Sequence, residues 1–252
     1  MQKILVIGDS CTDIFIYGIC KRLNPEAPVP IISELYRTEN RGMSGNVHEN
    51  LIHLGLDADF ITHPEKIIKT RFVEEKSNYI LLRFDEDPFI NSISAGDICD
   101  IPFEEYDMVI ISDYDKGYLL EDDIKYILKN SKISFIDTKK PIDEWIKDAT
   151  FIKINEPEFN SLKNNKKIIN NLSDKLIITL GDKGATYCGK FFKSTKEVMV
   201  RDVVGAGDTF LAALAGHYLL NKKIEDAIDF ANLCASQVVS KKGVAYPNKI
   251  LL

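Results

Sequence analysis

The chain has 252 residues, of which 45% are hydrophobic and 28% are charged. These are the proportions of an ordinary globular protein with a sizeable core. Its net charge of −6 argues against a broad nucleic-acid surface, and no apolar run reaches the length of a membrane span. Five scattered cysteines without a C-x-x-C pair are typical of reduced thiols, so a cytoplasmic location is expected.

Short apolar runs alternate with helical patterns along the chain. Strands are expected where an apolar run ends in a turn-forming or polar residue, at 4–7, 108–111, 133–136, 151–154 and 176–180. Helical patterns occupy residues 44–54, 121–129, 157–162, 209–220 and 224–240. This alternation predicts an α/β fold, doubly wound, with a mostly parallel sheet and helices on both faces. We expect one domain over residues 1–252.

Two segments interrupt this rhythm with strand-forming residues of mixed polarity. Residues 29–35 form one, and residues 70–84 form the other, where two strand patterns flank Ser77 and Asn78 in the manner of a hairpin. We therefore expect a small β lid at about 14–41 and 69–86, outside the main sheet. Because an isolated hairpin is marginally stable in water, the lid is expected to pair with that of a second copy in a homodimer.

The most informative stretch is residues 202–210, which read D-V-V-G-A-G-D-T-F and lead into an apolar helical pattern. Backbone amides at a helix start, unobstructed by side chains at Gly205 and Gly207, form an anion site. Asp208 directly after them is well placed to take a proton from a nucleophile that attacks a phosphoryl group. The alternative is a Gly-rich turn in which Asp208 caps the helix.

This stretch resembles the C-terminal signature of the ribokinase-like (PfkB) carbohydrate kinases. The resemblance implies that Asp208 is the catalytic base and that Gly205, Ala206 and Gly207 form the anion hole. Asp202 matches a position that, in many members, helps to hold a monovalent cation such as K⁺. ATP and Mg²⁺ are the implied donor and metal.

Further motifs extend the resemblance along nearly the whole chain. Residues 8–13 match a G-D-x-x-x-D motif, which implies that Asp13 contacts sugar hydroxyls. Residues 42–46 read G-M-S-G-N where the family has G-G-A-x-N, so Gly42 and Asn46 match the sugar side. Met43 stands in place of a glycine associated with the lid hinge, and is a departure from the family pattern.

A second group of motifs corresponds to the nucleotide side of the family. The matching positions are Lys139, Asn155, Thr179, Gly181, Gly184 and Asn232. Glu158 completes an N-x-x-E motif with Asn155 and is implied to hold Mg²⁺ through water. Taken without the family, this pair is also a common helix-capping pattern.

Residues 24–30, N-P-E-A-P-V-P, resemble a stretch of the D-glycero-β-D-manno-heptose-7-phosphate kinases. Residues 112–117 resemble the S-D-Y-x-K-G of the same subfamily, which implies that Asp113 and Lys116 lie on the sugar side. The acceptor would then be the anomeric hydroxyl of a sugar phosphate. Arg71, Arg83 and Lys116 are candidates for binding its existing phosphate, and the alternative is that they are exposed lid and loop charges.

Met43 and a short segment after Gly55 depart from the family pattern, so two alternative functions remain. Only fourteen residues, 56–69, separate Gly55 from Thr70, where family members usually have more strand and helix. A kinase of another sugar or nucleoside is one alternative. A nucleotide- or sugar-binding protein without turnover is the other. Heptose kinases often carry a fused nucleotidyltransferase domain, whereas these 252 residues are expected to form the kinase domain alone.

Overall fold

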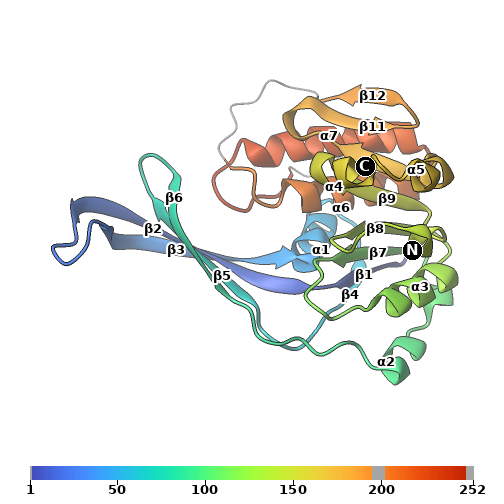
Figure 1. The fold of residues 1–252 in the computed structure, drawn as a ribbon, viewed down its shortest axis with the longest axis horizontal. Coiled ribbons are helices and arrows are strands. Elements are labelled where there is room, and N and C mark those ends of the chain that lie inside the picture. The colour runs from blue at the N-terminus through green and yellow to red at the C-terminus, as the bar shows by residue number, and fades with distance from the viewer. Residues whose placement is uncertain (1, 195–201, 248–252) are drawn as a thin grey trace.

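The computed structural model describes residues 2–194 and 202–247, which form a large sheet and a smaller one (Figure 1). The large sheet has the strand order β12-β11-β10-β9-β8-β7-β1-β4. Its strands are β1 (Ile4–Gly8), β4 (Ala58–Ile61), β7 (Met108–Asp113), β8 (Ser134–Thr138), β9 (Phe151–Asn155), β10 (Leu176–Thr179), β11 (Gly184–Tyr187) and β12 (Lys190–Lys193). Pairing is parallel from β10 to β4, and antiparallel at β11 and β12. The expected α/β class is therefore confirmed.

Helices cover both faces of this sheet because alternate strand residues point to opposite sides. On β7, Val109 and Ile111 pack in the core that holds α3, α4 and α5, while Met108 and Ile110 pack against α1, α6 and α7. The helices are α1 (Ser44–His53), α2 (Ala95–Cys99), α3 (Glu121–Asn130), α4 (Glu156–Leu162), α5 (Lys166–Leu172), α6 (Ala206–Asn221) and α7 (Ile224–Val239). Short 3₁₀ turns are η1 (Phe103–Glu105), η2 (Glu144–Ile146) and η3 (Gly181–Lys183). The helical pattern after residue 208 becomes α6, a largely buried helix.

The smaller sheet is the expected lid. It has the order β3-β2-β5-β6, formed by β2 (Ser10–Leu23), β3 (Pro30–Met43), β5 (Ile68–Glu74) and β6 (Tyr79–Glu86). The hairpin around Asn78 is confirmed, and Asn78 has a positive φ of 59°. The first lid segment is longer than expected, since β2 begins at Ser10. As Figure 1 shows, the lid extends well away from the large sheet.

The two sheets join at two points that position the site. After β1, Gly8 passes so close to β7 that a Cβ on it would lie 1.9 Å from the Ser112 carbonyl oxygen, so only glycine fits. The chain then enters β2 and returns through β3 directly into α1 at Met43. On its inner face the lid packs Phe15, Tyr17 and Val73 against residues near the start of α6 and near the C-terminus, Val204 and Val244.

Candidate active site

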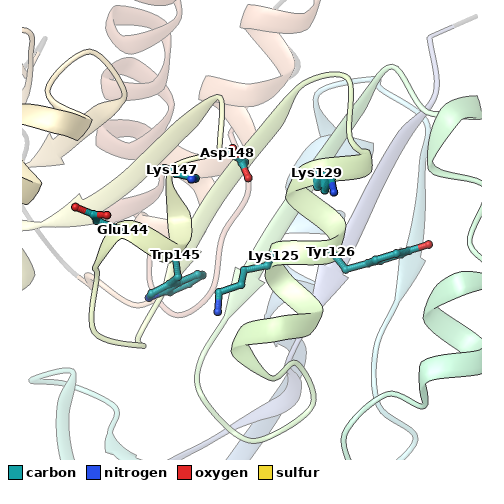
Figure 2. A pocket seen from close by; sticks show the side chains of 7 residues that line it. All are labelled: Lys125, Tyr126, Lys129, Glu144, Trp145, Lys147 and Asp148. Carbon is teal, nitrogen blue, oxygen red and sulfur yellow. The ribbon is translucent and has the colours of Figure 1, made fainter.

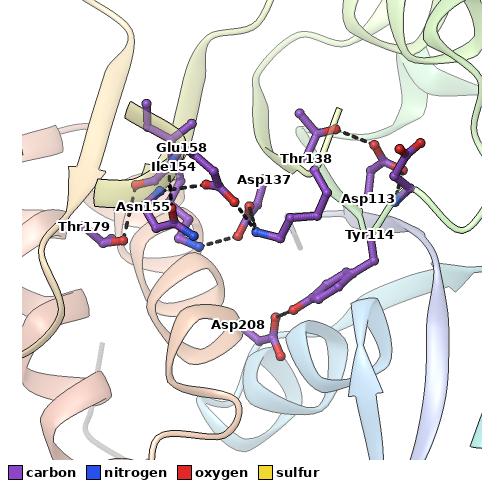
Figure 3. A network of polar contacts seen from close by, with 12 residues as sticks. Asp113, Tyr114, Asp137, Thr138, Ile154, Asn155, Glu158, Thr179 and Asp208 are labelled. Carbon is purple, nitrogen blue, oxygen red and sulfur yellow. Dashed lines mark hydrogen bonds and ion pairs between the residues drawn. The ribbon is translucent and has the colours of Figure 1, made fainter. Parts of the chain in front are cut away.

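Asp208 lies in the first turn of α6, shortly after Gly205, which has a left-handed backbone (φ 78°). The side chain is buried, with 6% of the residue's surface exposed. Its oxygens accept hydrogen bonds from the Tyr114 hydroxyl (2.7 Å, Figure 3) and from Asn46 Nδ2 (2.9 Å). Burial raises the pKa of Asp208 to about 6, because these two hydrogen bonds and the charge of Lys153 offset only part of the desolvation. Such a carboxyl group is suited to proton transfer near neutral pH.

The start of α6 presents backbone N–H groups to an anion. The Ala206 N–H donates to the Val203 carbonyl (3.3 Å), and no side chain of the described residues caps the helix. The amides of Gly207 and Asp208 lie in the first turn, where a helix provides no carbonyl for them. A Cβ on Gly207 would lie 3.3 Å from Lys153 Nζ, so this ammonium lies beside the same turn. An anion bound here would meet both amides and a positive charge.

Lys153 belongs to a chain of charged groups near the carboxyl ends of β8 and β9, in which Figure 3 labels Asp137 and Glu158. It forms a buried ion pair with Asp137, and Lys139 Nζ also approaches that carboxylate, at 3.5 Å. Lys139 donates to Glu158 Oε1 (2.5 Å). The expected capping pattern is also present, since Glu158 and Asn155 exchange two hydrogen bonds of 2.8 Å. Glu158 therefore caps α4 and contacts the charged network at the same time.

The residues expected on the sugar side lie at the junction of lid and large sheet. Asp13 is buried in an ion pair with Arg71, across the β2–β5 pair. A Cβ on Gly42 would lie 2.2 Å from Asp13 Oδ2, so glycine is needed for this approach. Asn46 connects α1 to the expected base, Asp208. The structure thus brings Asn46 and Asp208 together from positions 162 residues apart.

Met43 adopts a backbone conformation that favours glycine. Its φ of 57° and ψ of −132° place it at the N-cap of α1 in a region that side chains strongly disfavour. This explains physically why a glycine suits the position. In this chain the methionine side chain is buried, and the strain costs on the order of 1–3 kcal/mol.

The cations expected to bind a substrate phosphate are paired in this structure. Lys116 forms an ion pair with Asp87 (2.7 Å), and Arg83 with Asp85 (2.6 Å). Arg71 is buried against Asp13, as described above. Each of the three therefore already has a carboxylate partner.

Asp113, also expected on the sugar side, is buried at the end of β7. It accepts hydrogen bonds from Thr138 Oγ1 and from Lys140 Nζ (3.0 Å). Burial raises the pKa of Asp113, and these two partners oppose that rise. Its carboxylate is thus engaged in holding neighbouring loops together.

Four of the residues expected on the nucleotide side lie on β10, η3, β11 and α7. Thr179 Oγ1 donates to the Ile154 carbonyl (3.3 Å), and Asn232 Nδ2 donates to the Phe192 carbonyl (3.2 Å) from a buried position. Gly184 is required by close packing, since a Cβ there would lie 2.1 Å from the Phe192 carbonyl oxygen. Gly181, by contrast, faces open space and has a φ of 62°. Of these four, Gly181 has the freest surroundings for a ligand.

Asp202 precedes the turn into α6, beside the segment 195–201 that lies outside the described residues. Its Oδ1 accepts the Val204 N–H (3.0 Å). Its own N–H donates to the Val239 carbonyl (3.3 Å). The carboxylate keeps acceptor capacity for a cation.

Sequence reasoning missed two contributors to this site, Tyr114 and Lys153. Tyr114 stands out in the sequence only as part of a motif, and Lys153 only as part of an apolar run. Asp9 is the first acid of its motif, and the structure shows that its Oδ2 accepts the backbone N–H groups of Tyr114 (2.8 Å) and Lys116 (3.1 Å). A lysine inside a buried strand is a usable signal, because such a cation needs a partner.

Among the described residues, no group of three or more His, Cys, Asp or Glu side chains could hold a metal ion directly. One oxygen of Asp137 is buried without a hydrogen bond. Glu158 lies in the same charged network. This donor set fits a Mg²⁺ ion bound mainly by nucleotide phosphates and water, which is how Mg²⁺ is usually held.

A surface hollow lies between α3 and η2, and its lining includes Lys125, Lys129 and Trp145 (Figure 2). Lys147 and Asp148, also in the lining, precede β9, whereas Asn155 ends that strand. The hollow is therefore at the opposite end of the strands from the Asp208 network.

Within the described ranges, no helix is both long and apolar enough to cross a membrane.

The description "pfkB family carbohydrate kinase" belongs to a family model that matches residues 111–251, more than half of the chain. The chain belongs to this family. Two curated relatives, both called Bifunctional protein HldE, come from a Nitratiruptor species and from Campylobacter fetus subsp. fetus. They are 31% and 32% identical over 96% and 97% of this chain. The pfkB-family chain spans only 62% and 64% of their lengths.

Solved structures confirm the ribokinase-like fold. A nucleoside kinase of Methanocaldococcus jannaschii, an archaeal member of the ribokinase family, superposes with a TM-score of 0.69 at 20% identity, covering 96% of this chain and 93% of that one. A ribokinase of Arabidopsis thaliana complexed with ribose and ATP gives 0.69 at 15% identity, covering 98% and 96%. Phosphofructokinase-2 of Escherichia coli in complex with potassium gives 0.73 at 14% identity, covering 98% and 95%.

Proposed function

We propose that this chain is an ATP-dependent sugar kinase with Asp208 as its general base. One observation carries the proposal: a buried carboxyl group with a pKa of about 6 shares a single helix turn with free amides, and the Lys153 ammonium lies beside that turn. Phosphoryl transfer needs a proton acceptor and an anion site close to each other. Membership of the carbohydrate kinase family supports the same reaction class.

In the proposed mechanism, Asp208 accepts the proton of the attacking sugar hydroxyl while Asn46 and Tyr114 hold its carboxylate in place. The segment Gly205, Ala206 and Gly207 provides amides that stabilise charge on the transferring phosphoryl group. Lys153 adds a positive charge beside this turn. Because these groups are fixed before the substrates bind, positioning and electrostatics account for most of the rate increase.

The nucleotide is proposed to lie along β10, η3 and α7, beside Thr179, Gly181, Gly184 and Asn232, with its phosphates towards Lys139 and Asn155. Mg²⁺ would neutralise phosphate charge, with Glu158 holding its water ligands. Asp202 would help to hold a monovalent cation such as K⁺. We place the reaction in the cytoplasm, where ATP is supplied, with a small sugar as partner and no nucleic-acid partner.

The proposed acceptor is a sugar phosphate, with heptose 7-phosphate as the leading candidate and its anomeric hydroxyl as the attacking group. The resemblance of residues 24–30 and 112–117 to heptose-7-phosphate kinases supports this choice. The close approach of Asp13 to Gly42 supports a sugar at the junction of lid and large sheet. Asp113 and Lys116 follow on the adjacent loop.

We also propose a homodimer that forms through the lid. Several large apolar side chains on the lid are exposed, among them Leu35, Tyr79, Leu82 and Phe84 at 53%, 72%, 58% and 55%. Clusters of this kind on a monomer are typical of an interface. A second copy brings an equivalent apolar surface, and a two-fold contact is the most common assembly.

The experiment is an assay of ADP release with ATP, Mg²⁺ and a panel of sugars, sugar phosphates and nucleosides, using the wild type and Asp208→Asn. We expect turnover with a sugar phosphate and a loss of about 10² to 10⁴ in kcat for the variant, with ATP binding retained. Turnover only with a nucleoside would mean that the acceptor is a nucleoside and not a sugar phosphate. Nucleotide binding without any turnover would favour a binding protein over a kinase.

A further inference from the structure

A lysine of the lid, Lys69, is buried against the candidate active site and forms no direct ion pair within the described part of the chain, although its charge adds to the effect of Arg83 in lowering the pKa of the neighbouring Asp85. It is 8% exposed, and its ammonium forms no hydrogen bond or ion pair with any residue that the structure describes. Its contact is with the ring of Tyr114, whose centroid lies 5.7 Å from Nζ. The hydroxyl of that same ring donates to Asp208. The ammonium therefore lies on the lid side of the proposed base.

The strand register shows why Lys69 faces the site. Lys69 on β5 is opposite Asp13 on β2 and opposite Asp85 on β6. Arg71, two residues further along β5, lies on the same face and contacts Asp13. The inner face of the lid thus has a row of charged side chains directed at the sugar side.

The two arginines of this row form ion pairs with its two aspartates, and Lys69 is the remaining cation. Arg71 is paired with Asp13, and Arg83 is paired with Asp85. The row therefore has three cations for two carboxylates, and within residues 2–194 and 202–247 Lys69 is the cation of this row without a partner. A buried ammonium without a directly paired carboxylate is costly. The cost is offset when an anionic ligand completes the pair.

A second cation, from the large sheet, also approaches Tyr114. Lys139 Nζ is also 5.7 Å from the centre of the Tyr114 ring, but it already contacts Asp137 and Glu158. Lys139 follows β8 of the large sheet, whereas Lys69 belongs to the lid. The two lysines therefore reach Tyr114 from the lid and from the large sheet, and of these two only the lid lysine lacks a direct ion pair with a carboxylate among the residues described.

We propose that Lys69 binds the phosphate that the acceptor sugar already carries. This assignment rests on the proposed function, and it replaces Arg71, Arg83 and Lys116 as the leading phosphate ligand because those three already have carboxylate partners. One charge-assisted contact of this kind changes affinity roughly tenfold or more. Lys69 would then be the residue by which the site distinguishes a sugar phosphate from the free sugar.

The test compares wild type, Lys69→Met and Lys69→Arg with heptose 7-phosphate and with unphosphorylated heptose. For Lys69→Met we expect kcat/KM to fall tenfold or more with the phosphate and to stay nearly unchanged with the free sugar. Lys69→Arg keeps the charge and should recover much of the loss. Lys76→Met is the matched control, because Lys76 is an exposed lysine in the turn of the same hairpin.

Calorimetric titration gives a readout that is independent of turnover. Heptose 7-phosphate should bind Lys69→Met at least tenfold more weakly, while ATP should bind as it does to the wild type. Equal losses with both sugars would overturn the proposal, since they would assign Lys69 to the transferring phosphoryl group. Unchanged selectivity in an active variant would also overturn it. Failure of the proposed function looks different, because the wild type itself would then phosphorylate neither sugar.

Discussion

At the scale of single residues, the behaviour of Asp208 depends on competition between burial and hydrogen bonding. Burial favours the neutral acid, whereas Asn46 and Tyr114 donate to the ionised form and lower its pKa. The balance leaves the pKa at about 6. A general base is active when ionised, so the proposed base would be largely charged at pH 7 and largely protonated at pH 5.

The first prediction concerns the pH dependence of kcat/KM, which reports ionisations of the free enzyme. We expect kcat/KM to rise with pH through an ionisation of Asp208 near 6, because protonated Asp208 cannot accept the sugar proton. Tyr114→Phe removes a hydrogen bond to the carboxylate and should therefore raise this pKa, by up to about one unit. Rate measurements between pH 5 and 9 check both statements. If the midpoint of the pH profile on the acid side were the same in Tyr114→Phe as in the wild type, this role for Tyr114 would be contradicted.

The two glycines before Asp208 should respond differently to substitution. Gly207 is in the first helical turn, and an added Cβ would meet only the flexible end of Lys153, at 3.3 Å. We expect Gly207→Ala to lower kcat by about tenfold or more, because the added methyl group would obstruct the approach of the phosphoryl group to the amides of this turn, with little change in melting temperature.

Gly205 is the contrasting control. Its φ is 78°, and an added Cβ would lie 2.6 Å from Asn46 Nδ2. Gly205→Ala should therefore lower the melting temperature as well as the activity, by on the order of 1–2 kcal/mol in stability. Thermal unfolding measured beside kcat separates the two effects. A large loss of stability in Gly207→Ala would mean that this glycine serves the turn and not the anion.

At the scale of elements, the lid face that points away from the site carries apolar residues. Leu82 and Phe84 have the opposite parity on β6 from Arg83 and Asp85, so they project from the outer face. We predict that Leu82→Lys and Phe84→Lys together convert a dimer to a monomer. The two added positive charges would oppose burial of that face against a second copy. Light scattering at micromolar concentration measures the change.

The matched control for the lid is Leu220→Lys at the end of α6, which is also exposed (42%) but is distant from the lid in sequence and in the fold. This variant should leave the oligomeric state unchanged. A wild type that is already monomeric would contradict the proposed dimer. If both variants dissociated alike, the cause would be the added positive charge and not the loss of the apolar lid face.

Elements with a strong local pattern could be predicted from the sequence, and contacts between distant elements could not. The buried strand at 108–111 and the helix after residue 208 were expected because each has a long apolar run. β2 was expected only in part, because its first residues are half polar and alternate in burial. Its identity as a strand depends on β3 and β5, which pair with it along its length.

The same limit applies to the candidate site. Asp208 and its glycines were expected because a single stretch of residues contains both the acid and the turn. The hydrogen bond from Tyr114 to Asp208 joins residues 94 positions apart, and it exists only because β7 and α6 are brought together by the fold. Likewise, the lack of a direct ion pair at Lys69 becomes visible only when the pairing of the neighbouring charges in the described residues is known.

At the scale of the whole molecule, the candidate site is assembled from both sheets. The end of β7 in the large sheet and the start of α6, a helix that covers this sheet, form one part of the site. The lid contributes β2 and β5. α1 joins the two, since it follows β3 directly and carries Asn46 to the base. A change in lid position would therefore move Asp13 and Lys69 together relative to Asp208.

The place of β1 in the large sheet has a consequence for how the chain folds. β1 lies between β4 and β7, and its partners in β7 are 104 residues later in the chain. Pairings of such large sequence separation are slow to form, because the entropy of loop closure opposes them before the contacts can compensate. During synthesis, the apolar strand Ile4–Gly8 emerges before β7 and stays without this neighbour until β7 has been made. The interval before β7 appears is therefore when the nascent chain is most exposed to aggregation.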